Sequence, residues 1–174
     1  FITQIAILES YNAVVIGPGI GQNDETKAML KQFLENRDKP CILDADALNI
    51  ISQNVELQAL IPQNSILTPH PKEFERLFGK CDSGYERMKK ASEFAQKLEL
   101  IIILKGANTL IATPDGKLFF NSTGNSGMAT AGSGDVLAGM LGGLLAQGYL
   151  PEDTAKIGVY LHGLAGDLSL RKQS

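Results

Sequence analysis

The sequence has little cysteine, and this shortage excludes two kinds of site. Cys41 and Cys81 are its only two cysteines in 174 residues, and their separation fits neither a structural zinc site nor a redox pair. A chain without disulfide or metal spacing is typical of a reducing compartment. We expect both thiols to be packing residues.

Long basic runs and long apolar runs are also missing. The net charge is −3 and the pI is near 5.4, and no block of lysine and arginine is present that would follow a phosphate backbone. The longest apolar runs, such as ELIIILKG, are far shorter than the roughly 20 residues of a membrane-spanning helix. No signal-peptide pattern follows Phe1. We therefore expect a cytoplasmic protein that binds neither nucleic acid nor membranes.

Short runs of valine, isoleucine and leucine alternate with helical patterns in the first hundred residues. The runs lie at 13–17, 41–44, 65–68 and 100–106, and runs apolar on both faces are typical of strands inside a parallel sheet. Between the last two, residues 85–98 repeat apolar side chains at spacings of three and four, which predicts an amphipathic helix. The alternation predicts an α/β fold with a mostly parallel central sheet and helices on both faces.

The rhythm changes after residue 108. Pro114-Asp115-Gly116 is a turn signal between two extended runs, so a hairpin is expected over 109–121. Helices are expected over about 135–147 and from Pro151 or Glu152 to Leu170. Gly139, Gly142 and Gly143 in the first of them favour close packing. With no low-complexity linker, residues 1–174 are expected to belong to one domain.

The unusual residues follow the predicted strands. GPGIG follows the first strand, DADALN the second, PHPKEF the third and KGANT the fourth. In open α/β sheets, ligands bind beyond the carboxyl ends of the strands. The four loops therefore predict one shared site.

Each loop also has a structural interpretation. Gly17, Gly19 and Gly21 fit a tight turn or a close approach by a ligand, and they form no standard dinucleotide or phosphate motif. For Asp44 and Asp46, capping of the next helix is favoured over holding magnesium through water.

The remaining polar residues are weighed in the same way. A ligand contact is favoured for His70 between its two prolines, where Glu73 either orients it or begins the helix. Lys105 at the end of a strand suits a nucleotide contact and a surface charge equally. His162 is interpreted as a packing residue rather than a ligand.

The segment Gly132-Ser133-Gly134-Asp135 carries the strongest signal. The first amides of a helix lack intrahelical partners and, with the macrodipole, favour anionic oxygen, while glycine leaves them unobstructed. Asp135 fits either a favourable helix-start carboxylate or a general base. A base beside an anion site indicates deprotonation of a hydroxyl with stabilisation of a transferring phosphoryl group. Phosphoryl transfer is therefore the leading reaction class.

Five motifs together resemble a known family. GPGIG, LDADALN, LTPHPKEF, LKGANTLI and NSTGNSGMATAGSGDVLAG occur in this order, and from about residue 10 to residue 170 the chain resembles the ADP/ATP-dependent NAD(P)H-hydrate dehydratases of the ribokinase-like superfamily. The resemblance implies ADP- or ATP-dependent dehydration of (6S)-NADH hydrate and NADPH hydrate. Phosphorylation of the C6 hydroxyl would turn a poor leaving group into a good one, and Mg²⁺ would accompany the nucleotide.

The resemblance also implies roles for single residues. Asp135 matches the base and a substrate contact, Gly132 and Gly134 match the anion site, and Gly21 and His70 match substrate contacts. The nucleotide contacts match Lys105, Gly106, Ala107, Asn108, Thr109 and Gly134. Asn125 and Thr130 lie in the matching glycine-rich loop without an individual role. Asp46 and Glu73 are expected to influence magnesium indirectly, and no direct metal ligand is assigned.

The chain also departs from the family pattern. Relatives carry further N-terminal strands with another glycine-bearing loop, and they continue beyond the last helix. In bacteria the domain is often fused behind an NAD(P)H-hydrate epimerase, so an epimerase, fused or separate, is an expected partner. We also expect a homo-oligomer. The alternatives are a vitamin or sugar kinase of the same superfamily and a non-catalytic nucleotide-binding module.

Overall fold

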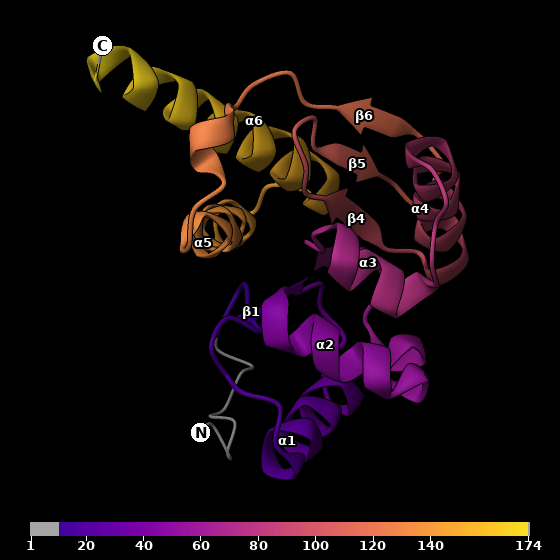
Figure 1. Ribbon diagram of the computed structural model, residues 1–174. Coiled ribbons are helices and arrows are strands. Elements are labelled where there is room, and N and C mark those ends of the chain that lie inside the picture. The colour runs from indigo at the N-terminus through magenta and orange to yellow at the C-terminus, as the bar shows by residue number, and fades with distance from the viewer. Residues whose placement is uncertain (1–10, 174) are drawn as a thin grey trace.

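A six-stranded sheet runs through the computed structural model, which describes residues 11–173 (Figure 1). The strands lie side by side in the order in which they occur in the chain. The first four strands pair in parallel, and the fifth runs antiparallel to both of its neighbours, the fourth and the sixth. They are β1 (Val15–Ile16), β2 (Ile42–Leu43), β3 (Ile66–Leu67), β4 (Ile101–Leu104), β5 (Leu110–Ala112) and β6 (Leu118–Phe120). The predicted α/β class and the hairpin are confirmed.

One face of the sheet is covered by the helices between its parallel strands. They are α1 (Asp24–Glu35), α2 (Ala45–Gln53), the 3-10 helix η2 (Val55–Leu60), α3 (Pro71–Phe78) and α4 (Gly84–Leu98). Successive strands are added in one direction, and right-handed crossovers then place every connecting helix on the same face. The sequence predicted helices on both faces without this separation into an early and a late group.

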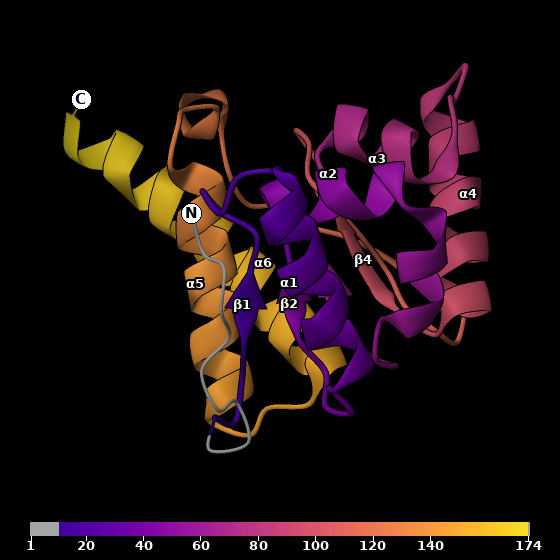
Figure 2. The same ribbon diagram turned by 90° about the horizontal axis from the view of Figure 1, so that it is seen from below.

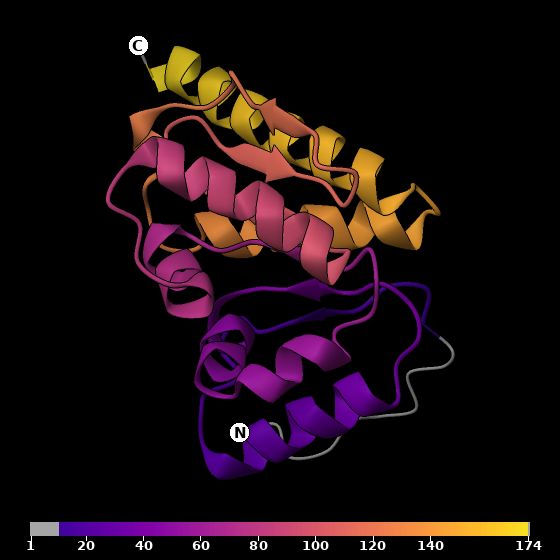
Figure 3. The same cartoon turned by 90° about the vertical axis from the view of Figure 1, so that its right-hand side faces the viewer.

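The other face is covered by two helices from the end of the chain. They are α5 (Ser133–Ala146) and α6 (Pro151–Gln173), preceded by the 3-10 helix η3 (Ser126–Met128). Figure 3 shows α4, in magenta, on the opposite side of the hairpin from the yellow α6. Both helices were predicted, and α6 begins at Pro151 as expected. No helix in residues 11–173 is long and apolar enough to cross a membrane.

Two apolar clusters share the strands between them. Leu43, Leu67 and Ile102 belong to the cluster under α1–α4, whereas Ile42 and Ile101 belong to the cluster under α5 and α6. Neighbouring strand residues point to opposite faces, so an apolar run with both faces covered buries every position. This explains why the strands read as continuous apolar runs.

Glycine lets α5 approach the edge of the sheet. Figure 2 shows α5 beside β1, and a Cβ added at Gly142 would lie 2.5 Å from Val15 Cγ2. The close-packing prediction is thus confirmed for Gly142. It is wrong for Gly139 and Gly143, where an added Cβ would meet nothing within 4 Å.

The two cysteines behave as packing residues. Cys41 is fully buried, and this burial raises the pKa of its thiol to about 11. Cys81 is partly buried and packs against the same core cluster as Cys41. The sequence-based prediction is therefore confirmed for both.

Candidate functional site

Loops from four strands meet at the carboxyl edge of the parallel part of the sheet. The Asp44 amide donates to the Ile16 carbonyl at 3.2 Å, which joins the ends of β1 and β2. The Lys105 amide donates to the Pro69 carbonyl at 2.9 Å, which joins the ends of β3 and β4. The structure therefore brings together the loops that the sequence singled out.

A buried ion pair crosses this edge. Lys105 Nζ lies 2.8 Å from Asp44 Oδ1, and the Asp44 side chain is 2% exposed while that of Lys105 is 23% exposed. Asp44 occupies the N-cap position of α2, but its side chain makes no capping hydrogen bond. The capping prediction for Asp44 is wrong because its carboxylate accepts from the ammonium instead. Lys105 is correspondingly not a free surface charge.

Asp46 reaches in the opposite direction. Its Oδ2 accepts from the Gly21 amide at 2.9 Å, and its Oδ1 accepts from Gln22 Nε2 at 2.7 Å. Asp46 lies in the first turn of α2, but its carboxylate binds the GPGIG loop and the residue that follows it. The capping prediction is therefore wrong for Asp46 as well. Gly21 has a φ of 79°, which glycine adopts without a steric penalty.

The GPGIG loop passes directly against the backbone of Asp44, the residue that follows β2. A Cβ added at Gly17 would lie 1.7 Å from the Asp44 carbonyl oxygen, and Gly17 has a φ of 137°. Glycine is therefore required at position 17 for this close backbone contact. The Ile20 amide donates to the Gly17 carbonyl at 3.4 Å, which confirms the tight-turn interpretation for Gly17.

The start of α5 offers free amides. Gly132 is its N-cap, with a φ of 87° and no side chain to cap the helix. The Ser133 amide donates to the Thr130 carbonyl at 3.3 Å, but within residues 11–173 no hydrogen bond is recorded for the amides of Gly134 and Asp135. Such amides at a helix N-terminus are suited to anion binding.

Lys105 borders these amides. A Cβ built on Gly134 would lie 3.5 Å from Lys105 Nζ and 3.8 Å from Asp44 Oδ2. We call the amides of Gly134 and Asp135 together with Lys105 Nζ the anion seat. Helix-start amides and an ammonium are donors of the kind that bind phosphate oxygens, and here the ammonium is also paired with Asp44. The Asp135 side chain is exposed in the first turn of α5, where an approaching ligand can reach it.

His70 has a structural role at the start of α3. Its Nδ1 accepts from the amides of Lys72 and Glu73, and Glu73 Oε2 accepts from the His70 amide at 2.9 Å. This is a reciprocal capping box, in which Glu73 both orients His70 and begins the helix. Nε2 lies 3.4 Å from Glu73 Oε1, and the His70 side chain remains 44% exposed. A substrate contact by His70 stays a prediction.

His162 lies closer to the site than its sequence context indicated. Its Nε2 is 3.4 Å from Ser133 Oγ, at the first residue of α5. Burial lowers the pKa of the imidazole, against the opposing effect of a hydrogen bond with Ser133. His162 is half-buried and thus partly a packing residue, as expected, but it also borders the helix start.

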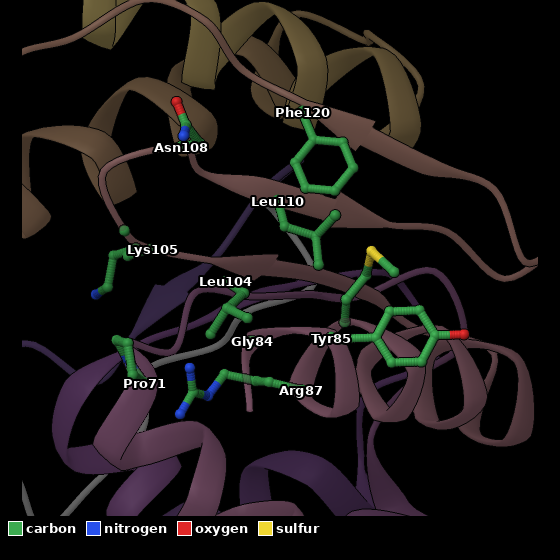
Figure 4. Close-up of a pocket in the computed structure, with 11 residues that line it drawn as sticks. Pro71, Gly84, Tyr85, Arg87, Leu104, Lys105, Asn108, Leu110 and Phe120 are labelled. Atoms are coloured by element: carbon green, nitrogen blue, oxygen red, sulfur yellow. The ribbon is translucent and has the colours of Figure 1, made fainter. Parts of the chain in front are cut away.

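Residues 105–109 form the turn between β4 and β5, where Thr109 Oγ1 donates to the Gly106 carbonyl. Gly106, Ala107 and Asn108 are exposed. A cavity of about 400 Å³ opens beside this turn. Figure 4 shows Lys105 at one end of it, extending away from the aromatic rings of Tyr85 and Phe120.

The glycine-rich approach to α5 is fastened to α6. The Gly124 amide and Asn125 Nδ2 donate to the two carboxylate oxygens of Asp167, at 2.9 and 3.0 Å. A Cβ added at Gly163 would lie 2.2 Å from Thr123 Oγ1, so α6 packs closely on this loop. Sequence reasoning missed Asp167 because a lone carboxylate in a long helix carries no motif.

A family model described as NAD(P)H-hydrate dehydratase matches residues 2–174. A bifunctional NAD(P)H-hydrate repair enzyme of Moorella thermoacetica is 40% identical over 168 residues, which cover 95% of this chain and 32% of that protein. The chain therefore spans about a third of the length of this curated relative.

Solved structures agree with the family match. The ADP/ATP-dependent NAD(P)H-hydrate dehydratase of Bacillus subtilis, co-crystallised with ATP and Mg²⁺ and soaked with CoA, aligns with a TM-score of 0.80 and 36% identity, over 95% of this chain and 60% of that chain. A ribokinase-like superfamily protein of Enterococcus faecalis aligns with a TM-score of 0.80 and 33% identity, over 92% of this chain and 56% of that one. The predicted ribokinase-like fold is confirmed.

Proposed function

Because the chain belongs to the NAD(P)H-hydrate dehydratase family, we propose that it takes part in the repair of hydrated NADH and NADPH, with ADP or ATP as phosphoryl donor. The proposal treats residues 1–174 as part of one ribokinase-like domain acting on the (6S) hydrates. The observation that carries it is the anion seat, where Lys105 Nζ meets the start of α5 beside a buried carboxylate.

The anion seat would hold the phosphoryl group during transfer. The amides of Gly134 and Asp135 and the ammonium of Lys105 would face its oxygens, and Gly132 would keep the approach free of a side chain. Fixed donors aimed at developing negative charge are among the largest contributions to catalysis. The turn from Lys105 through Gly106, Ala107, Asn108 and Thr109 would lie against the rest of the nucleotide.

Asp135 would act on the hydroxyl of the substrate. Its exposed carboxylate takes the proton from the C6 hydroxyl as that oxygen attacks the terminal phosphorus, and AMP leaves from ADP or ADP leaves from ATP. Elimination of phosphate together with a ring proton then restores the dihydronicotinamide. Gly21 and His70 would bind the dinucleotide on the side of the first and third loops.

Magnesium would come with the nucleotide. Within residues 11–173 no group of three or more potential His, Cys, Asp or Glu ligands lies together, so these residues do not form a protein cage for a metal ion. Mg²⁺ commonly keeps several waters and binds through one or two carboxylates plus substrate phosphates. We therefore place it on the phosphates, where it neutralises charge, with Asp46 and Glu73 at most influencing it indirectly.

The assay is direct. The chain is incubated with NADH or NADPH hydrate and either ADP or ATP, and the absorbance of the reduced nicotinamide is followed. We expect it to return with either donor present and ADP to be the better one. A stable phosphorylated product from a vitamin or sugar alcohol, without hydrate repair, would assign the site to a small-molecule kinase instead.

The cellular setting completes the proposal. The bifunctional relative supports an epimerase partner, either fused or separate, that would supply the (6S) form of the hydrate. We also propose a cytoplasmic homo-oligomer. Sedimentation of the purified protein and cell fractionation test these two points.

A further inference from the structure

The two aspartates of DADALN point to different halves of the site. Asp44 and Asp46 are separated by one residue at the start of α2, yet their carboxylates reach partners on opposite sides. Asp44 accepts from Lys105 in the fourth loop, and Asp46 accepts from the Gly21 amide in the first loop. Neither carboxylate has a recorded hydrogen bond to the helix that it begins.

Asp44 controls where the Lys105 ammonium lies. A lysine side chain has a flexible stem of four carbons, so its ammonium takes many positions in water. Here its Nζ is held 2.8 Å from a carboxylate that is 2% exposed, at the border of the anion seat. Within residues 11–173 the Asp44 carboxylate forms a hydrogen bond with Lys105 alone. This ion pair holds the ammonium next to Gly134.

Asp46 controls the shape of the first loop. Its two oxygens hold the Gly21 amide and the Gln22 side chain, and Gly21 has a positive φ. Loss of this acceptor would release the backbone at the residue that the family resemblance assigns to the hydrated dinucleotide. The same carboxylate lies away from the anion seat in every contact recorded for it.

We propose that Asp44 and Asp46 are positioning residues for different ligands. Asp44 acts through Lys105 on the phosphates of the nucleotide, and Asp46 acts through the Gly21 turn on the hydrated dinucleotide. The inference rests on the proposed function and deepens it. Two aspartates separated by one residue at the start of α2 thereby serve both substrates.

The test compares Asp44→Asn and Asp46→Asn, with Asp24→Asn as the control. Asp24 is a helix-start aspartate whose side chain is 98% exposed and pairs with Lys27 at 3.2 Å, so the control makes the same charge change at a solvent-exposed carboxylate. Calorimetric titration measures the affinity of each variant for ADP alone and for NADPH hydrate alone. Thermal unfolding of each variant reports its folding separately.

Selective losses are expected. A hydrogen bond to a charged group corresponds to roughly a tenfold to a hundredfold change in affinity. Asp44→Asn should therefore lower the affinity for ADP by this factor. The same substitution should leave the affinity for NADPH hydrate within about twofold of the wild-type value, as expected for distant and independent sites. Asp46→Asn should show the reverse pattern, and Asp24→Asn should change neither affinity.

A double substitution separates positioning from general loss of structure. If Asp44 acts through Lys105, the loss of ADP affinity in Asp44→Asn/Lys105→Met should be close to that of Lys105→Met alone. Additive losses would overturn the Asp44 half of the proposal. If Asp44→Asn does not fold, Asp44→Glu keeps the charge but displaces the carboxylate, and it should still weaken ADP selectively.

Other results would overturn the inference. Equal changes in both affinities in both variants would show a common structural role, and unchanged affinities would show no role. A wild-type chain that does not bind ADP would also contradict it. Absence of hydrate turnover in a wild-type chain that binds both ligands would contradict the proposed function and leave the two affinity comparisons intact.

Discussion

Asp135 is the residue on which the proposed chemistry depends. Its carboxylate is exposed in the first turn of α5, beside the anion seat and not within it. Asp135→Asn should reduce turnover by about 10²–10⁴-fold, because general-base assistance contributes this much. The affinity for the nucleotide should stay within about tenfold, since the helix amides are unchanged. Steady-state kinetics and calorimetry check both values, and near wild-type turnover would exclude Asp135 as the base.

His162 should make stability depend on pH. Burial lowers the pKa of its imidazole below the value of 6.5 expected in the unfolded chain. As the pH falls through this value, the unfolded state takes up a proton first, so stability is lost toward acid. The free energy of unfolding should therefore fall more between pH 7 and pH 5 in the wild type than in His162→Gln. Parallel urea titrations of the two proteins measure the difference, and identical pH profiles would contradict it.

Residue types were easier to predict than residue partners. The loops at 17–21, 44–49, 69–74 and 105–109 were placed at one edge from the sequence, because strand ends in a parallel sheet share an edge. The Asp44–Lys105 pair joins β2 and β4 across β3, and no local pattern specifies a contact over that separation. Because these partners are distant in the sequence, local reasoning favours capping for Asp44 and Asp46, and that prediction is wrong.

At the scale of elements, α6 determines the shape of the loop that leads to α5. Gly163→Ala adds a Cβ 2.2 Å from Thr123 Oγ1 and 2.7 Å from the Thr123 backbone. The gain in helix propensity of about 1 kcal/mol should be outweighed by overpacking, which typically costs about 1–3 kcal/mol. We expect net destabilisation and weaker ADP binding, because the displaced loop precedes the anion seat.

Gly139→Ala is the matched control for that substitution. Gly139 also lies inside a helix, but an added Cβ would meet nothing within 4 Å. Alanine there should raise the free energy of unfolding by up to about 1 kcal/mol, through helix propensity alone. Chemical denaturation of both variants tests the pair, and a stabilised Gly163→Ala protein would refute the close-packing argument.

Element types followed from periodicity, whereas their faces followed from topology. The apolar runs and the spacing in residues 85–98 predicted β4 and α4 with little error. The grouping of α1–α4 on one face needed the strand order, which depends on contacts between distant segments. The sequence left Glu73 either orienting His70 or beginning the helix, and the structure shows that it does both, whereas the N-cap role of His70 itself was not predicted.

At the scale of the whole molecule, the shared strands should couple the two faces. Ile42 and Leu43 are adjacent and fully buried, but they belong to different clusters. Ile42→Ala and Leu43→Ala should each lower the free energy of unfolding by about 2–5 kcal/mol. In both variants we expect one transition that includes α1 and α6 together. Circular dichroism and hydrogen exchange measure this, and separate melting of the two faces would contradict it.

The strand order also has a consequence for the order of assembly during synthesis. Each strand pairs with the one made immediately before it, so a chain leaving the ribosome finds every strand's partner already present. Asp44 and Lys105 can thus meet as soon as β4 is complete, while α5 and α6 emerge afterwards. The amides at the start of α5 are synthesised after the four strand-end loops, so a nascent chain should acquire its capacity to bind nucleotides only once α5 has left the ribosome.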